Sequence, residues 1–271
     1  MLIAQISDPH ITISGTLREN KYATVSRLQE AVSHILKLPT LPDIVLVTGD
    51  CADNGLPEEY QLVQQCLAPL TMPVYLIPGN HDNRQNLRQT FGEQGSRHHA
   101  EFIQYVVETE SLRLLALDTL HEGHGGGQLC PERLDWLTAQ LAEAPEKPTI
   151  LFQHHPPFLT GVSVLDNAGF EGLVAFREIV AGQPQIEQIV AGHIHCHLIR
   201  RVGNSIAVTC PALSFQLQHP LSEAGPLLAT TGQGAMLLHY WTSATGLLTY
   251  TYPLGETAAP ELVYDGAKWL I

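Results

Sequence analysis

Five short polar motifs, each directly after an apolar run typical of a buried strand, constrain this chain more than any other feature. In order they are Asp8-Pro9-His10, Gly49-Asp50, Gly79-Asn80-His81-Asp82, His154-His155-Pro156 and Gly192-His193-Ile194-His195. Carboxylate, amide and imidazole groups are common ligands of divalent metals. Open α/β sheets build their sites at the carboxyl ends of strands, so these motifs can meet. Together they offer about the seven ligands that two neighbouring metals need, which predicts a dinuclear metal hydrolase.

The hydrophobic pattern predicts an α/β fold. Strands are expected over residues 2–7, 43–48, 73–77, 149–153 and 186–191, each ending at a motif, and helices over 21–38, 57–70 and 131–142. Antiparallel pairs are expected at 102–107 with 112–117 and at 235–241 with 247–252, and further strands at 197–202 and 205–209. Early βαβ alternation followed by antiparallel pairs predicts a four-layer α/β/β/α sandwich, in which helices flank two mixed β-sheets.

The length of 271 residues suits a single domain. We expect residues 211–271 to complete the second sheet and to add a loop on the substrate side. Within that segment, residues 216–234 are rich in Pro, Gly, Ser and Thr, which is typical of a long functional loop.

Charge and cysteine content limit which binding partners and which cellular compartment are expected. The net charge of −13 argues against general nucleic-acid binding, and no apolar run is long enough to span a bilayer. Residues 1–6 lack a basic region and lead straight into Asp8, which argues against a signal peptide. Five cysteines without CxxC spacing suit reduced thiols, so a cytoplasmic protein is expected.

The motif set resembles the calcineurin-like metallophosphoesterase family, whose pattern is D-x-H, G-D, G-N-H-[DE], H and G-H-x-H. The resemblance runs from Asp8 to His195 with no motif missing. It implies two divalent cations (Fe, Mn, Zn or Co, with Fe and Mn favoured) and a ligand set for each. One metal is expected to take Asp8, His10, Asp50 and His195, and the other Asp50, Asn80, His154 and His193, with Asp50 bridging.

Three residues of the motifs are assigned a role by more than their type: His154, His81 and Asp82. His154 and His155 cannot face the same way on an extended chain, and the His-x-Pro register of the family selects His154. His81 resembles the family histidine that contacts the phosphoryl group or the leaving oxygen, and Asp82 is expected to orient its ring. Each motif alone has a plain structural reading as a turn or a cap; all five in order favour the metal site.

The resemblance implies hydrolysis of a phosphoester by attack of a metal-bridging hydroxide, with Asp50 and His81 in the catalytic machinery. The stretches ISDPH, GDCADNGLPEEY, YLIPGNHD, FQHHPP and AGHIH resemble the bacterial branch that holds class III cyclic-nucleotide phosphodiesterases and glycerophosphodiesterases. A small phosphodiester is therefore the expected substrate, with 3′,5′-cyclic nucleotides such as cAMP foremost. Phe215 stands where glycerophosphodiesterases tend to have a histidine, which weakens that alternative.

Other readings stay open. The same site also suits a phosphomonoesterase or nucleotide pyrophosphatase, and a metal-stabilised scaffold without catalysis is the alternative outside enzymes. Late strands often pair between subunits in such chains, so a homodimer or higher oligomer is expected. His121 and His124 flank a glycine-rich stretch that suggests a mobile loop near the site, and Phe215 suits either packing or stacking on a nucleobase.

Overall fold

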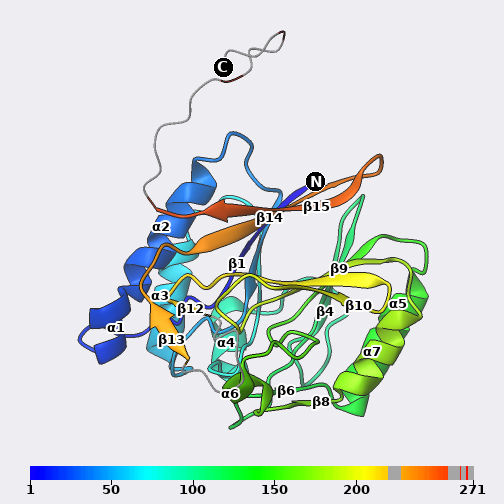
Figure 1. The fold of residues 1–271 in the computed structure, drawn as a ribbon, viewed down its shortest axis with the longest axis horizontal. Coiled ribbons are helices and arrows are strands. Elements are labelled where there is room, and N and C mark those ends of the chain that lie inside the picture. The colour runs from blue at the N-terminus through cyan, green and yellow to red at the C-terminus, as the bar shows by residue number, and fades with distance from the viewer. Residues whose placement is uncertain (219–226, 256–262, 264–266, 268–271) are drawn as a thin grey trace.

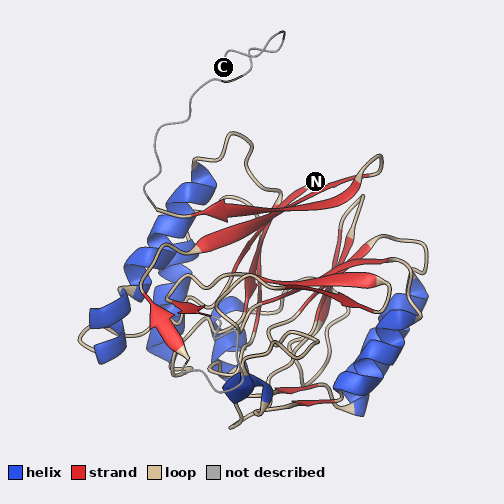
Figure 2. Cartoon of the chain, viewed as in Figure 1, coloured by secondary structure: helices blue, strands red, loops and turns tan. Residues whose placement is uncertain are grey.

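The computed structural model describes residues 1–218, 227–255, 263 and 267. Two mixed sheets face each other at its centre (Figures 1 and 2). The N-terminal sheet has the order β15-β14-β1-β2-β3, with bounds β1 (Leu2–Ile6), β2 (Ile44–Thr48), β3 (Val74–Ile77), β14 (Ala235–Thr242) and β15 (Gly246–Pro253). The second sheet has the order β10-β11-β9-β7-β5-β4, with bounds β4 (Tyr105–Glu108), β5 (Arg113–Ala116), β7 (Thr149–Phe152), β9 (Ile186–Ala191), β10 (Ile199–Val202) and β11 (Ser205–Thr209).

Helices cover the outer faces of both sheets, which confirms the four-layer sandwich. Figure 1 shows one group of helices beside the N-terminal sheet: α1 (Leu17–Tyr22), α2 (Thr24–Leu36), α3 (Pro57–Leu67) and α4 (Arg84–Phe91). On the opposite side lie α5 (Pro131–Glu143) and α7 (Leu173–Ala181). Shorter elements are α6 (Ser163–Asp166), the pair β6 (Gly127–Gln128) and β8 (Phe170–Glu171), and the pair β12 (Gln216–Gln218) and β13 (Leu228–Thr230).

Strand direction decides where the motifs gather. β1, β2 and β3 are parallel to one another, and so are β5, β7, β9 and β11. The inner strands are strongly apolar, as strands covered on both faces must be; every residue of Ile44–Thr48 is buried. All five motifs follow strands of these two parallel sets, so they lie at carboxyl ends of both sheets.

Several predicted elements differ from the structure. The segment 211–271 was expected to complete the second sheet, but its described strands β14 and β15 extend the N-terminal sheet at the free edge of β1. The expected helix at 21–38 is divided at Ala23, which has a left-handed backbone with φ 51°. The expected loop at 216–234 contains the antiparallel pair β12 and β13, while residues 219–226 lie outside the described part.

A hydrogen-bonded network between the two sheets holds a buried histidine. His239 on β14 contacts Gln5 Oε1 through Nε2 at 3.0 Å and Thr249 Oγ1 through Nδ1 at 2.9 Å. Thr249 in turn donates to Gln188 on β9. Burial lowers the pKa of His239 to about 3, with a smaller effect from His197.

This network predicts acid sensitivity of the fold. The unfolded chain takes up a proton at His239 below about pH 6.5, whereas the folded chain resists until about pH 3, so stability falls as pH drops through this window. We expect a loss of about 1.4 kcal/mol per pH unit from this group. Urea unfolding at pH 4.5 and 6.5 measures it. His239→Gln, which keeps an amide donor for Gln5, should show a slope smaller by one proton; an unchanged slope would contradict the assignment.

Among the described residues, no helix has both the length and the apolar character needed to cross a bilayer.

Candidate metal centre

A first group of side chains meets where β1, β2 and β9 end. Ligand atoms of Asp8, His10, Asp50 and His195 all lie within 4.8 Å of one another, and all four residues are buried. His10 Nε2 is 3.1 Å from His195 Nε2 and 3.4 Å from Asp50 Oδ2, and His195 Nε2 is 3.5 Å from Asp8 Oδ1. Two carboxylates and two imidazoles around one point form a donor set suited to a divalent transition metal.

A second group adjoins the first through Asp50. His154 Nε2, after β7, lies 3.4 Å from the same Asp50 Oδ2 and 3.2 Å from Asn80 Oδ1, after β3. The His193 ring lies 5.0 Å from the His154 ring, measured between centroids. One carboxylate oxygen is thus equally close to a ring nitrogen of His10 and of His154, which is the position of a bridging ligand.

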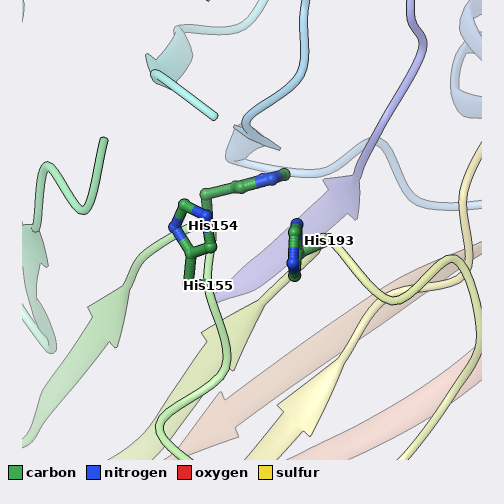
Figure 3. Close-up of side chains that lie close together, drawn as sticks. All are labelled: His154, His155 and His193. Carbon is green, nitrogen blue, oxygen red and sulfur yellow. The ribbon is translucent and has the colours of Figure 1, made fainter. Parts of the chain in front are cut away.

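His155 lies closer to this second group than alternation along the strand predicts. Figure 3 shows His154, His155 and His193 close together, and their ligand atoms lie within 4.8 Å of one another. The His155 ring is 4.5 Å from the His193 ring, and its Nδ1 contacts Thr119 Oγ1 at 2.9 Å. Among the described residues its buried Nε2 has no hydrogen-bond partner. β7 ends at Phe152, so the alternation of an extended strand need not hold at His154 and His155, and both side chains are buried.

Each of three imidazoles in the two groups is held by its second ring nitrogen. His10 Nδ1 lies 3.1 Å from Asp53 Oδ1, His154 Nδ1 donates to Thr48 O at 2.8 Å, and His195 Nδ1 donates to Phe215 O at 2.9 Å. Such contacts fix the tautomer and leave Nε2 as the free donor of an electron pair. All three Nε2 atoms point into the cluster, as a metal site requires.

Three motif glycines are needed because metal-site side chains occupy the space of a Cβ. A Cβ on Gly192 would lie 2.7 Å from Asp8 Oδ2 and closer still to Ser7 Oγ. A Cβ on Gly79 would overlap Asp50 Oδ1, and one on Gly49 would overlap the His154 ring. The glycines therefore allow the strand ends to approach the ligands, as predicted for Gly192.

Gly192→Ala should disrupt the first group. The new methyl group must displace Ser7, Asp8 and the Thr48 carbonyl, and the expected result is a loss of metal affinity of at least about 10–100-fold, the usual effect of disturbing the partners of a ligand. Metal titration followed by calorimetry measures it. Gly182→Ala, where the nearest atom is an ordinary 3.6 Å away, is the matched control. Equal metal affinities of the two variants would show that Gly192 does not need to lie so close to Asp8.

The backbone at the ligands is unusual. Asp8, His10, Asp50, His193 and His195 all have positive φ, between 46° and 72°, and they are five of the seven described non-glycine residues that do. Non-glycine residues in this region cost on the order of 1–3 kcal/mol each, and such strain gathers at functional sites. The surrounding structure holds these residues in place because their side chains must converge.

Asp53 is a residue that the sequence interpretation missed. Its carboxylate contacts His10 Nδ1, accepts from Arg18 Nε at 2.9 Å and lies 3.6 Å from His81 Nδ1. His81 Nδ1 donates to Asp53 O at 2.8 Å, and the His81 ring packs against His10 at 4.7 Å. Asp53 lies only three residues beyond Asp50, within the quoted GDCADNG stretch; that proximity was the available signal.

The prediction that Asp82 orients the His81 ring is wrong. Asp82 was expected to orient this ring, but its carboxylate instead accepts from the backbone N–H groups of Cys51, Ala52 and Gly79 and from the Tyr60 hydroxyl. The turn after Asn80 sends Asp82 inward beneath the site, and His81 outward over His10. Asp82 therefore fixes the loops that carry Asp50 and Asn80.

Charge within the cluster is concentrated on the two carboxylates. Burial opposes ionisation of Asp50, but the imidazoles of His154 and His10 hold its pKa well below the usual range. Burial likewise acts against protonation of His154, yet the charge of Asp50 raises its pKa to about 9. Burial and the neighbouring His154 lower the pKa of His193 to about 3. A buried carboxylate that stays ionised among imidazoles is suited to a divalent cation, because metal ligands bind in their deprotonated forms.

Four further aromatic residues lie outside both ligand groups. The rings of His121 and His124 stack with centroids 4.0 Å apart in a loop, and the buried Gly127 of β6, which follows that loop, lies against His155. Phe215 packs against His195 at 4.4 Å and stacks on Tyr22 at 4.7 Å. His197 contacts Thr251 and lies outside both ligand groups.

Comparison with known proteins agrees with this geometry. The calcineurin-like phosphoesterase family matches residues 1–197. The chain is 33% identical to a probable glycerophosphodiester phosphodiesterase of Arcobacter nitrofigilis over the full length of both chains. It is 30% identical to a probable cyclic nucleotide phosphodiesterase of a Synechococcus strain, over 82% of this chain and 84% of the relative.

A similar fold occurs in a solved dimetal phosphatase from Danio rerio, with a TM-score of 0.70 at 13% identity, covering 93% of this chain and 99% of that one. At this identity the likeness concerns the fold alone. The family match spans all five motifs and the converging ligands. This chain therefore belongs to the calcineurin-like phosphoesterase family.

Proposed function

We propose that the protein is a metal-dependent phosphodiesterase with a dinuclear centre. The observation that carries the proposal is the position of Asp50 Oδ2, 3.4 Å from Nε2 of both His10 and His154. One metal would be held by Asp8, His10, Asp50 and His195, and the other by Asp50, Asn80, His154 and His193. Imidazole and carboxylate donors suit several divalent metals, and the family resemblance favours Fe or Mn, with Zn and Co as further candidates.

When bound, two divalent cations would supply positive charge for the phosphoryl oxygens and lower the pKa of a water molecule. The chain itself supplies alignment and proton transfer. Asp53 and the Thr48 carbonyl hold the ligand rings in place, so that little reorganisation is needed during the reaction. His81 is one-third exposed and its Nδ1 is occupied by Asp53 O, so Nε2 is free to donate to the departing oxygen when the ring is protonated.

The substrate class is a small phosphodiester. The similarity to a probable cyclic nucleotide phosphodiesterase supports 3′,5′-cyclic nucleotides such as cAMP, whereas Phe215 packs between Tyr22 and His195. The full-length similarity to a probable glycerophosphodiester phosphodiesterase supports glycerophosphodiesters as the second candidate. A phosphomonoesterase or nucleotide pyrophosphatase activity on the same site is the alternative outside diesters.

A substrate panel tests the proposal. Protein loaded with Mn or Fe is assayed with cAMP, cGMP, glycerophosphoethanolamine, bis(4-nitrophenyl) phosphate and 4-nitrophenyl phosphate. We expect the diesters to be hydrolysed with higher kcat/KM than the monoester. Preference for the monoester would replace the diesterase assignment. Inactivity of fully metal-loaded protein on every ester would favour a non-catalytic scaffold.

The assignment of His154 over His155 predicts unequal effects of alanine substitution. His154 Nε2 contacts both Asp50 and Asn80, whereas His155 contacts neither in the described structure. His154→Ala should therefore remove one metal and most activity, on the order of 10²-fold or more. His155→Ala should keep both metals. Metal content by mass spectrometry decides, and equal metal loss in the two variants would make His155 a ligand.

We further propose a cytoplasmic homodimer. All five cysteines are free thiols, which supports a reducing compartment. β15 is an edge strand, and Tyr240, Leu248 and Tyr250 are exposed on it and its neighbour β14. Exposed apolar side chains at an unpaired edge support pairing with a second copy. Light scattering after size-exclusion chromatography tests this, and a monomeric mass at micromolar concentration would reject it.

A further inference from the structure

An apolar cavity of about 80 Å³ adjoins the second ligand group. Its wall includes His155 and His193 on the side of the cluster, and Phe158, Leu165, Phe170 and Leu173 away from it. Phe158, Leu165 and Phe170 come from the segment between β7 and α7, of which the proposed ligand sets use only His154. The His193 ring lines the cavity and lies 5.0 Å from the His154 ring. The cavity therefore adjoins the proposed metal centre.

The polar groups of the outer wall are already satisfied. The Asp166 carboxylate accepts from the backbone N–H groups of Thr160 and Gly161 and from the Thr160 hydroxyl, so it closes its own loop. Aliphatic and aromatic side chains remain to meet a ligand. At the inner side, His155 Nε2 is buried and has no partner in the described part of the chain. The cavity is thus apolar outside and polar toward the cluster, which suits a group joined to a phosphate.

His81 and the cavity lie beside different ligand groups of the proposed metal centre. The His81 ring packs on His10, in the first group, while the cavity is bounded by His193, in the second. A phosphodiester has one leaving and one retained ester group. With the leaving oxygen facing His81, the cavity beside His193 would remain for the retained group.

We propose that this cavity binds the retained ester group of an acyclic phosphodiester, and that it selects small uncharged alkyl groups. The proposal rests on the phosphodiesterase function above and names a substrate class for the same site. The cavity volume is about half of the 150 Å³ apolar cavity that accommodates benzene, so it admits a few carbon atoms and excludes a nucleobase.

A homologous series of substrates tests the selection. Methyl, ethyl, n-propyl and 2-hydroxyethyl 4-nitrophenyl phosphates share one leaving group and differ only in the retained group. We expect kcat/KM to rise about fourfold for each added methylene up to propyl, the value of burying a methylene group. The hydroxyethyl ester should gain less than the propyl ester, because its hydroxyl group loses water without a partner. A flat series would overturn the proposal.

Two neighbouring side chains of α6 provide a matched pair of variants. Leu165 lines the cavity, whereas Val164 is exposed and lies outside its wall. Leu165→Ser should collapse the propyl-to-methyl ratio of kcat/KM towards one, and Leu165→Trp should bring it below one by filling the space. Val164→Ser should keep the wild-type ratio. If the Leu165 variants keep that ratio as well, the retained group binds elsewhere.

Binding without turnover separates the cavity from the reaction. Calorimetry on metal-loaded protein compares methylphosphonate with n-propylphosphonate, and we expect the propyl compound to bind on the order of tenfold more tightly. Equal affinities would overturn the proposal. Hydrolysis of all alkyl diesters at equal kcat/KM would leave the phosphodiesterase function standing and reject the cavity as a subsite. Tighter propylphosphonate binding without hydrolysis of any diester would support the subsite and reject the function.

Discussion

Asp50→Ala is expected to abolish hydrolysis and to lower metal content at both positions. Among the described residues, Asp50 has a carboxylate oxygen that lies 3.4 Å from a ring nitrogen in each ligand group, His10 Nε2 and His154 Nε2. Without it, each group loses a negative ligand, and two like-charged cations would lose the anion that separates them. A loss of activity beyond about 10³-fold follows, larger than for any residue that only orients a ligand.

The measurement combines metal analysis with turnover of bis(4-nitrophenyl) phosphate. Asp135→Ala, which removes an exposed carboxylate on α5, is the control for general effects of charge. Circular dichroism should show that both variants are folded. Asp50→Ala protein that still held two metals and kept near-normal turnover would show that Asp50 does not bridge.

His81→Ala is expected to keep both metals while lowering kcat by about 10²–10⁴-fold on substrates with alkoxide leaving groups. The ring contacts His10 but contributes no atom to either proposed ligand set. Its Nδ1 is fixed by Asp53 O, so the free Nε2 has a defined direction. A donor of this kind acts mainly in the transition state, so kcat should fall more than KM rises.

Comparison of leaving groups makes this test specific. Nitrophenolate departs without a proton, so its loss of rate should be much smaller than that for an alkoxide. His98→Ala, an exposed histidine bonded only to the Gln94 carbonyl among described partners, serves as the control. Equal losses for both leaving groups would remove the donor role, and a drop in metal stoichiometry would make His81 a ligand.

The elements that carry the motifs were predictable because their signal is local. The buried runs before Asp8, Asp50, Asn80, His154 and His193 form β1, β2, β3, β7 and β9 close to the expected bounds. Arg84–Phe91 was missed as a helix because it buries a single apolar residue, Leu87, and relies on Asn83 as its cap. Short polar helices of this kind owe their stability to tertiary contacts rather than to a repeated apolar pattern.

The parts of the site that the sequence did not reveal depend on contacts between distant segments. Thr119 reaches His155 across 36 residues, and Gln5 reaches His239 across 234. The placement of β14 beside β1 has the same origin, since either sheet has an edge that can receive a late hairpin. The direction of the His81 side chain depends on the turn after Asn80. A change in one backbone angle there would exchange the directions of His81 and Asp82.

The left-handed backbone of the five ligand residues links folding to metal exchange. Strain on the order of 1–3 kcal/mol at each position sums to a quantity comparable with the whole stability of an ordinary domain. Because the folded chain meets this cost, we expect the candidate ligands to converge before a cation binds. Exchange of the cations would then leave the fold unchanged.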